Sequence, residues 1–398
     1  MSELIKGNKN DLERAKAILG EMIENRRYFH QHPETGMELS NTVAYVMERL
    51  KEMGIEPQHC GGGVTALIGG KKEGPVFLLR ADMDALPMAE ESGLPFASTI
   101  DKAHTCGHDM HTAMLLGAAK LLKEEEDTLP GTVKLMFQPA EETLEGAKAM
   151  LADGILESPK VDGAMGVHMA PVIPCGIVGY SKGVVNTSSD CFTISINGKG
   201  GHGASPHNSI DPINVGVHIY LALQELVARE VDPADHVALT IGLFQAGNAD
   251  NIIPDTAKLG GTLRTINEET RKRMLERIRQ VTDLTAKTFR SSAQLEISGA
   301  TCALVLDSEG VDSVDGALKE VFGRGAMLAN TRMAGSEDFA EVSVRVPSIF
   351  LAIGGADPEE KEHFGGHHPK VRFDERSLAY GAAGYVCCAK AWLAAHQR

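Results

Sequence analysis

Long apolar runs are missing from this sequence of 398 residues. No continuous apolar stretch reaches the ~20 residues that a membrane-spanning helix needs. The first residues, MSELIKGNKNDLERAKAILGEM, are charged and have a helical pattern, without the apolar segment of a secretory signal peptide. We therefore expect a soluble chain that resides in the cytoplasm and inserts into no membrane.

Positive charge is also scarce. Lys and Arg number 39 against 54 Asp and Glu, so the formal net charge is −15. An acidic surface attracts neither nucleic acids nor anionic lipids, so we expect neither as a partner. The simplest role of this charge is to keep the protein soluble.

The cysteines form no disulfide framework. They are odd in number and scattered along the chain as Cys60, Cys106, Cys175, Cys191, Cys302, Cys387 and Cys388. Small secreted domains instead carry an even number of cysteines in a dense pattern. We expect most of these side chains to be buried apolar thiols.

Repeats and low-complexity linkers are absent, so the domain organisation rests on hydrophobic patterns. A chain of this length exceeds one core and predicts about two domains. Strand patterns alternate with helical ones up to residue 185, which predicts a largely parallel, layered α/β sheet. Residues 186–297 follow the order strand, helix, strand, strand, helix, strand of a ferredoxin-like α+β unit. We predict one domain from residues 1–185 and 298–398, interrupted by a second.

Metal-binding residue types gather in AHTCGHDMH, residues 103–111, directly before an apolar helical pattern. Cys106 and His108 are two residues apart, so a turn can direct both side chains inward. A helix N-terminus also favours the thiolate that a metal requires. By itself, this motif is better explained by a buried thiol beside a structural histidine.

Further candidate ligands stand at the ends of expected strands. Glu141 and Glu142 follow VKLMFQ, and adjacent carboxylates project in different directions, so one can bind a metal while the other faces a bound water. His168 closes the pattern VDGAMGVHM. Active sites of layered α/β domains gather at such strand ends. Taken singly, the glutamates could begin a solvated helix and His168 could be a core residue.

A glycine-rich turn, GGHHP, adds His367 and His368 before the last expected helix. One of them completes a set of N, S and O donors: Cys106, His108, Glu142, His168 and one histidine of this pair. Such a set is too large for one tetrahedral zinc ion and suits two divalent metal ions that share a carboxylate or water. Zinc and manganese both fit it.

A series of motifs makes the sequence resemble a known family. In the order and spacing of the amidohydrolase branch of the M20 metallopeptidases, the sequence contains ADMDALP, TCGHDMH, PAEETLEGA, GVHMAP, GKGGHGASPH, NIIPDTAKLGGTLRT, AGSEDFA and GGHHP. That branch includes hippurate hydrolases, N-acetyl-diaminopimelate deacetylases and plant auxin-conjugate hydrolases. The resemblance implies a two-metal α/β/α catalytic domain interrupted by a lid domain, through which the protein forms a homodimer or a tetramer.

The resemblance also implies residue roles. The implied metal ligands are Cys106, His108, Glu142, His168 and His367, and Glu141 is the implied general base. His367 is preferred to His368 because relatives place the ligand two residues before the proline of this turn. Asp82 stands where many M20 peptidases have a ligand histidine, and Cys106 and His108 restore the coordination. Asp84 is then expected to orient a metal-bound histidine.

Three residues of the inserted domain complete the expected site. His202 lies in a glycine loop, from which it could stabilise an oxyanion, and in the family this histidine reaches the neighbouring subunit's site. Asn251 and Arg264 resemble residues that hold a substrate carboxylate. A surface-loop histidine and a surface ion pair are the alternatives for His202 and Arg264. Glu337 and Asp338 in AGSEDFA are interpreted as acidic residues at a helix start, without a role in the chemistry.

These features predict a metal-dependent amidohydrolase that cleaves the amide bond of a small N-acyl amino acid, giving a carboxylate and a free amino acid. A dipeptidase or exopeptidase with the same two-metal site is the alternative, because such a site could cut any amide beside a free carboxylate. A metal-binding protein without turnover would instead carry an unreactive residue in place of Glu141.

Overall fold

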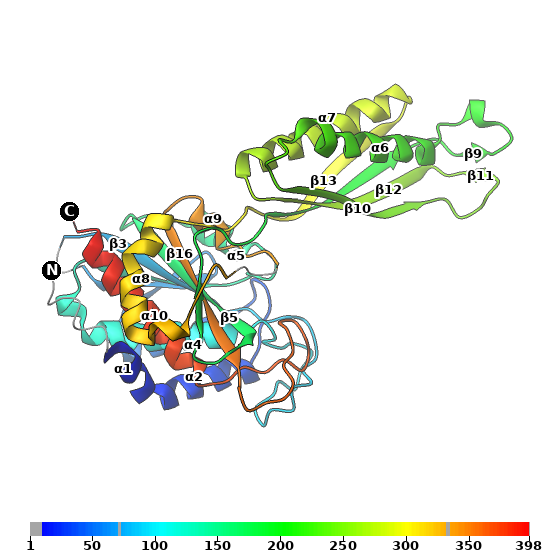
Figure 1. Cartoon of the computed structure of the whole chain (residues 1–398). Coiled ribbons are helices and arrows are strands. Elements are labelled where there is room, and N and C mark those ends of the chain that lie inside the picture. Colours follow the sequence, from blue (N-terminus) through cyan, green and yellow to red (C-terminus); the bar gives the residue numbers. More distant parts are fainter. Residues whose placement is uncertain (1–9, 71–72, 332–334, 398) are drawn as a thin grey trace. The chain divides into compact units, whose positions relative to one another are not determined.

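The structure is a computed structural model that describes residues 10–70, 73–331 and 335–397. The first part of the helical pattern at the N-terminus, residues 1–9, therefore lies outside the described residues. The chain forms two compact units (Figure 1). The larger unit comprises residues 10–185, 305–331 and 338–397, and the smaller unit comprises Asn186–Leu304 with residues 335–337.

The larger unit contains an eight-stranded sheet in the order β1-β2-β4-β3-β5-β16-β6-β15. The strands are β1 Pro57–Cys60, β2 Gly63–Gly69, β3 Val76–Asp82, β4 Thr132–Gln138, β5 Gly163–Pro174, β6 Val178–Tyr180, β15 Met327–Ala329 and β16 Ser348–Ala356. The four central strands β4, β3, β5 and β16 pair in parallel. The predicted α/β fold with a large parallel sheet is confirmed.

Helices cover this sheet. They are α1 Asp11–Ala17, α2 Leu19–Gln31, α3 Ser40–Glu52, α4 His108–Glu124, α5 Gly146–Ala152, α8 Ser308–Phe322, α9 Ala340–Ser343 and α10 Ser377–Ala395. The helical pattern expected at the N-terminus forms two helices, α1 and α2. Ile18 leaves the helical conformation with φ −102° and ψ 11°, and its N–H bonds to Ala15 O three residues back. The remaining short elements are β7 Gly183–Val184, β14 Val305–Leu306, η2 Glu126–Thr128 and η4 Arg324–Ala326.

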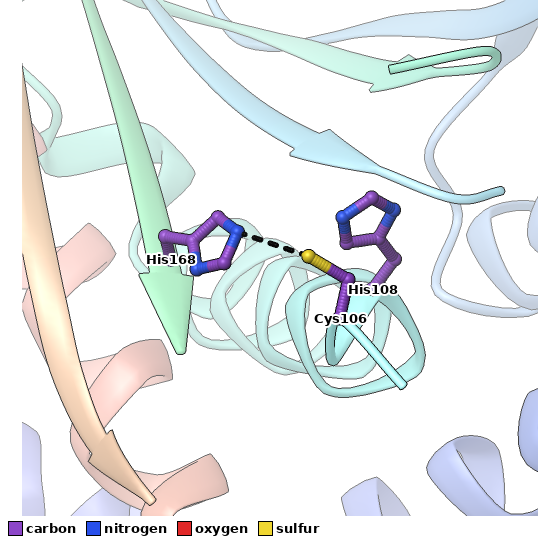
Figure 2. A group of neighbouring side chains, drawn as sticks. All are labelled: Cys106, His108 and His168. Carbon is purple, nitrogen blue, oxygen red and sulfur yellow. Dashed lines mark hydrogen bonds between the residues drawn. The ribbon is translucent and has the colours of Figure 1, made fainter. Parts of the chain in front are cut away.

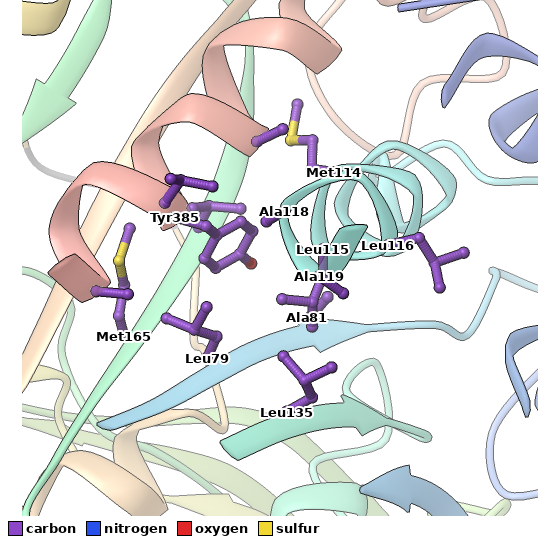
Figure 3. Close-up of a cluster of buried hydrophobic side chains, with 14 of the residues drawn as sticks. Leu79, Ala81, Met114, Leu115, Leu116, Ala118, Ala119, Leu135, Met165 and Tyr385 are labelled. Carbon is purple, nitrogen blue, oxygen red and sulfur yellow. The ribbon is translucent and has the colours of Figure 1, made fainter. Parts of the chain in front are cut away.

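The core of the larger unit lies between β3 and the helices α4 and α10, which pack side by side along it (Figure 1). Every residue of β3 is buried, as expected for a parallel strand that is covered on both faces. Leu79 and Ala81 meet Leu115 and Ala119 of α4 and Tyr385 of α10 in one apolar cluster (Figure 3). This packing fixes the start of α4 against the end of β3.

The smaller unit has the order β8 Ser189–Asn197, α6 Pro212–Glu230, β10 Val237–Ala246, β12 Thr256–Thr265, α7 Glu268–Thr288 and β13 Ser292–Thr301. Its antiparallel sheet has the order β10-β12-β8-β13, the ferredoxin-like arrangement that the sequence predicted. Asp211 and Asn267 cap α6 and α7 by accepting hydrogen bonds from backbone N–H groups of the first turn. β13 and the unit itself continue past the expected boundary at 297, to Thr301 and Leu304.

A small two-stranded ribbon extends the smaller unit beyond its main sheet. β9 Gly201–His202 pairs with β11 Ile252–Ile253, and η3 Pro206–Asn208 follows β9. In the described part of the chain, no helix combines the length and apolar character of a membrane span.

Candidate metal centre

Cys106 and His108 lie at the start of α4, on either side of Gly107. Gly107 has φ 94°, and a side chain there would meet Met169 Cγ at 3.0 Å and the Phe373 ring at 3.1 Å. Only glycine fits this left-handed and crowded position. The turn buries His108 completely and leaves Cys106 Sγ 3.4 Å from Nε2 of His168 (Figure 2). His168 does not close its strand as expected but lies within β5, which stays paired with β16 beyond it and continues to Pro174.

The two predicted glutamates occupy the turn that follows β4. Asp84 holds this turn, because its Oδ1 accepts from Glu141 N at 2.9 Å and its Oδ2 accepts from Glu142 N at 3.2 Å. The same Oδ1 lies 3.4 Å from His108 Nδ1. One carboxylate thus touches a histidine and both glutamate backbones, in keeping with the orienting role expected for Asp84.

The structure brings all six expected residues of the larger unit together. In each of three overlapping groups, the candidate ligand atoms lie within 4.8 Å of one another. The groups are Cys106 with His108 and His168, Cys106 with Glu142 and His367, and His108 with Glu141 and Glu142. Groups that share members in this way can hold two neighbouring ions more readily than one.

The hydrogen bonding of this cluster leaves places for metal ions. Neither ring nitrogen of His108 makes a hydrogen bond, nor does Oε1 of Glu142, although all three atoms are buried. Buried polar atoms without partners are costly and rare in native proteins. Imidazole, thiolate and carboxylate are the ligands that zinc and similar divalent metals take. These residues therefore fit a metal centre.

Charge in the cluster also suits cations. Burial opposes the charged form of His108, but the carboxylates of Asp82 and Asp84 outweigh it and raise the pKa of His108 well above its ordinary value. Burial raises the pKa of the Cys106 thiol, so the metal-free side chain is neutral. Burial would raise the pKa of Glu142, yet His367 and His108 lower it. A bound metal would replace protons that the cluster now holds.

The structure separates His367 from His368. His367 Nε2 lies 3.4 Å from Glu142 Oε1, and the backbone N–H of His367 donates to Thr105 O at 3.0 Å. The ring of His368 instead stacks on Phe364 with centroids 4.3 Å apart, and its Nδ1 accepts from Lys370 N. The geometry thus favours the histidine that the family resemblance selected.

Beneath these residues lies a buried ionic network that the sequence analysis did not foresee. Arg80 donates to Asp82 Oδ2 at 2.8 Å, to Gln138 Oε1 at 2.9 Å and to Asp338 Oδ1 at 3.1 Å. Asp338 lies two residues before α9, near the expected helix start, but it is fully buried and bound by Arg80. The available signal was Arg80 and Asp82 two apart in an apolar strand, where both side chains point to the same face.

The smaller unit separates its three expected residues. His202 and Asn251 lie together at the ribbon of β9 and β11, where Gly203 N donates to Asn251 O at 2.9 Å. Asn251 comes shortly before β12, which begins at Thr256, whereas Arg264 lies at the far end of this strand. Eight residues of strand span about 26 Å, so Arg264 of one chain cannot reach a carboxylate held by Asn251 of the same chain. The Arg264 Nη1 donates to Ser188 O at 3.4 Å.

Comparison with known proteins identifies the family. The model of peptidase family M20/M25/M40 matches residues 78–391, and the chain belongs to this family, as the motifs predicted.

Three curated relatives show the range of the family. The chain is 38% identical over 363 residues to N-acetyl-L-cysteine deacetylase of Bacillus subtilis, covering 90% of this chain and 85% of the relative. It is 36% identical over 391 residues to IAA-amino acid hydrolase ILR1-like 2 of Arabidopsis thaliana, covering 96% and 88%. It is 33% identical over 393 residues to thermostable carboxypeptidase 2 of Saccharolobus solfataricus, covering 97% and 98%.

Two crystal structures share the fold over nearly the whole chain. A protein from methicillin-resistant Staphylococcus aureus, described as a candidate aminohydrolase, has a TM-score of 0.89 and 35% identity, covering 97% of this chain and 100% of that one. The YXEP protein of Bacillus subtilis, described as a dinuclear metal-binding peptidase, has a TM-score of 0.78 and 32% identity, covering 95% and 99%. A two-metal site is thus known in a relative with this fold.

Proposed function

We propose that this protein is a metal-dependent amidohydrolase that converts an N-acyl amino acid into a carboxylate and a free amino acid. One observation carries the proposal: donors from four separate segments of the larger unit meet around His108 and Glu142, and both ring nitrogens of His108 and Oε1 of Glu142 are buried there without a hydrogen bond. The relatives named as a deacetylase of N-acetyl-L-cysteine and a hydrolase of IAA-amino acids support the N-acyl amino acid class.

The proposed ligands of two divalent metal ions, zinc or manganese, are Cys106, His108, Glu142, His168 and His367. Bound there, the metals would acidify a water molecule and polarise the amide carbonyl. Glu141 is buried beside Glu142 and within reach of His108, 3.9 Å from its Nε2. We assign to Glu141 the removal of the proton from the attacking water and its return to the leaving amine.

The protein is further proposed to act as a homodimer through its smaller unit. β10 is an edge strand, and exposed apolar side chains lie on it and on α6: Val217, Tyr220, Leu221, Leu243 and Phe244. An apolar face beside an unpaired strand edge favours pairing with a second copy. In such a dimer His202 would stabilise the oxyanion in the partner's site. Asn251 and Arg264 could then hold one substrate carboxylate from two different subunits.

A cytoplasmic location is also proposed. Cys106, Cys175 and Cys191 are only partly buried, and none of the three forms a disulfide in the structure. Free thiols persist in reducing compartments, whereas oxidising compartments favour disulfides.

The proposed substrate class is tested with a panel of N-acetyl, N-benzoyl and longer N-acyl amino acids, run beside dipeptides. We expect hydrolysis of the acylated amino acids, loss of activity on chelation, and recovery with Zn²⁺ or Mn²⁺. Faster cleavage of dipeptides would favour the exopeptidase that the carboxypeptidase relatives suggest. Metal-loaded protein without turnover on any member of the panel would contradict an enzymatic role.

A further inference from the structure

His111 is a fully buried residue in the first turn of α4, three residues after His108, and neither the motifs nor the proposed mechanism give it a role. Its Nε2 accepts a hydrogen bond from Met169 N at 2.8 Å. A backbone N–H can only donate, so this nitrogen carries no proton. The ring proton is therefore on Nδ1, which donates to Asp82 Oδ1 at 2.5 Å.

Met169 connects His111 to the metal centre. Its N–H is held by His111, and its carbonyl oxygen accepts from Nδ1 of His168 at 2.8 Å. Because a carbonyl can only accept, His168 carries its proton on Nδ1. The unprotonated Nε2 of His168 is then the nitrogen that lies 3.4 Å from Cys106 Sγ (Figure 2).

Strand pairing does not hold this part of β5 against β3. The register between the two strands ends at Arg80 and Gly166, two residues before His168. From there on, the His111 ring bridges the two strands, bonding Asp82 at the end of β3 and Met169 on β5. His111 and His168 have ring centroids 4.8 Å apart, so the bridge lies directly beside the candidate ligand.

The same contacts argue that His111 is not itself a ligand, although its nitrogens lie within 4.8 Å of ligand atoms of Asp82 and His108. Both of its nitrogens already have partners. Asp82 is also committed, because its second oxygen accepts from Arg80 at 2.8 Å.

We propose that His111 is a positioning residue of the metal centre, which acts through the Met169 backbone to hold His168 with Nε2 directed at the metal. In other metal sites, a carboxylate or a backbone carbonyl accepts a hydrogen bond from the metal-bound histidine and orients it. Here the carbonyl of Met169 orients His168, and His111 in turn fixes the Met169 backbone. The inference rests on the proposed metal centre and adds a residue that touches no metal or substrate.

Two conservative variants separate the two bonds of His111. In His111→Gln the side-chain amide reaches the place of Nε2 and can still accept from Met169 N. In His111→Asn the shorter amide reaches only the place of Nδ1 and can bond Asp82 but not Met169. We expect His111→Asn to weaken Zn²⁺ binding by about 10–100-fold, as for other partners of metal-bound histidines, and His111→Gln to restore most of the affinity. Zn²⁺ titration against a chromophoric chelator measures both.

Thr112→Val is the matched control. Thr112 is buried in the same turn, and its hydroxyl donates to Asp82 O at 2.9 Å, but it makes no bond to Met169. We expect this variant to keep the native Zn²⁺ affinity. A loss equal to that of His111→Asn would show that any loosening of the turn suffices, and would overturn the inference.

The remaining outcomes are also decisive. Equal losses of Zn²⁺ affinity in the Gln and Asn variants would indicate that the His111 ring is itself a ligand. Native affinity in His111→Asn would show that His111 only fills space. Either result overturns the positioning role. Native affinity in His168→Ala would do the same, because His111 acts through His168. A native protein that binds no Zn²⁺ would remove the proposed metal centre itself, which distinguishes that failure from a failure of this inference.

Discussion

The two units of the chain bury their sheets differently. In the larger unit, β3, β4 and β16 are buried along their whole length, whereas β10 of the smaller unit has no buried residue and β12 alternates. Water reaches one face of the smaller sheet and neither face of the central larger one. A buried nitrogen without a hydrogen bond, such as either nitrogen of His108, is therefore costly and favours a ligand, whereas the exposed ring of His202 has no such cost in water.

The largest effect is expected from removing a buried polar group of the larger unit that serves catalysis and is not needed for folding. Glu141→Ala should lower kcat by roughly 10²–10⁴-fold, the usual contribution of a general base, while metal content and thermal stability stay native. Initial rates and elemental analysis measure this. The control is Glu145→Ala, four residues later and exposed, which should stay active. Near-native turnover of Glu141→Ala would remove Glu141 from the mechanism.

The ionic networks of the two units offer a second comparison. Arg80 is fully buried between Asp82 and Asp338, whereas Arg271 of the smaller unit is 12% exposed and binds Asp190 through two bonds of 2.7 Å. Arg80→Met should destabilise the metal-free protein by about 3–5 kcal/mol, because it leaves buried carboxylates uncompensated.

Arg271→Met is the matched variant. It should cost less than Arg80→Met, because water can reach the edge of its site. Denaturant unfolding of both variants tests the difference, and equal losses would show that burial does not set the cost of breaking these pairs.

One cysteine from each unit can be compared for its effect on metal affinity. Cys106→Ser should weaken binding of at least one metal by about 10-fold or more, since even partners behind the ligands typically contribute that much. Cys191→Ser, on β8 of the smaller unit, should leave metal affinity unchanged. Two metals bound with native affinity in Cys106→Ser would contradict the proposed ligand set.

The smallest expected signal tests whether the units of two chains share a site. Glu141→Ala and His202→Ala chains should each be inactive alone, but a mixture that is dissociated and reassociated should recover about a quarter of native activity. Half of the dimers are then mixed, and each has one site with an intact Glu141 from one chain and an intact His202 from the other. No recovery after verified exchange would place His202 in its own chain's site or outside catalysis.

The sequence predicts local features of this protein well. The strand patterns and the position of the two glutamates just after β4 are visible in it, because each depends on residues close together in the chain. The network around Arg80 is not visible, because Arg80 and Asp338 are 258 residues apart. The bridge through His111 is equally hidden, since it depends on where β3 and β5 stop pairing.

The insertion of the smaller unit also affects how the protein is made. β5 and β16, neighbours in the central sheet, are separated in the chain by the whole smaller unit, and so distant a pairing is slow to form because of its loop-closure entropy. The smaller unit begins and ends on adjacent strands, with Ser189 opposite Thr301. Once the smaller unit has folded, the chain segments that enter and leave it lie side by side. During synthesis it can therefore fold before β16 emerges and shorten the loop that the larger sheet must close.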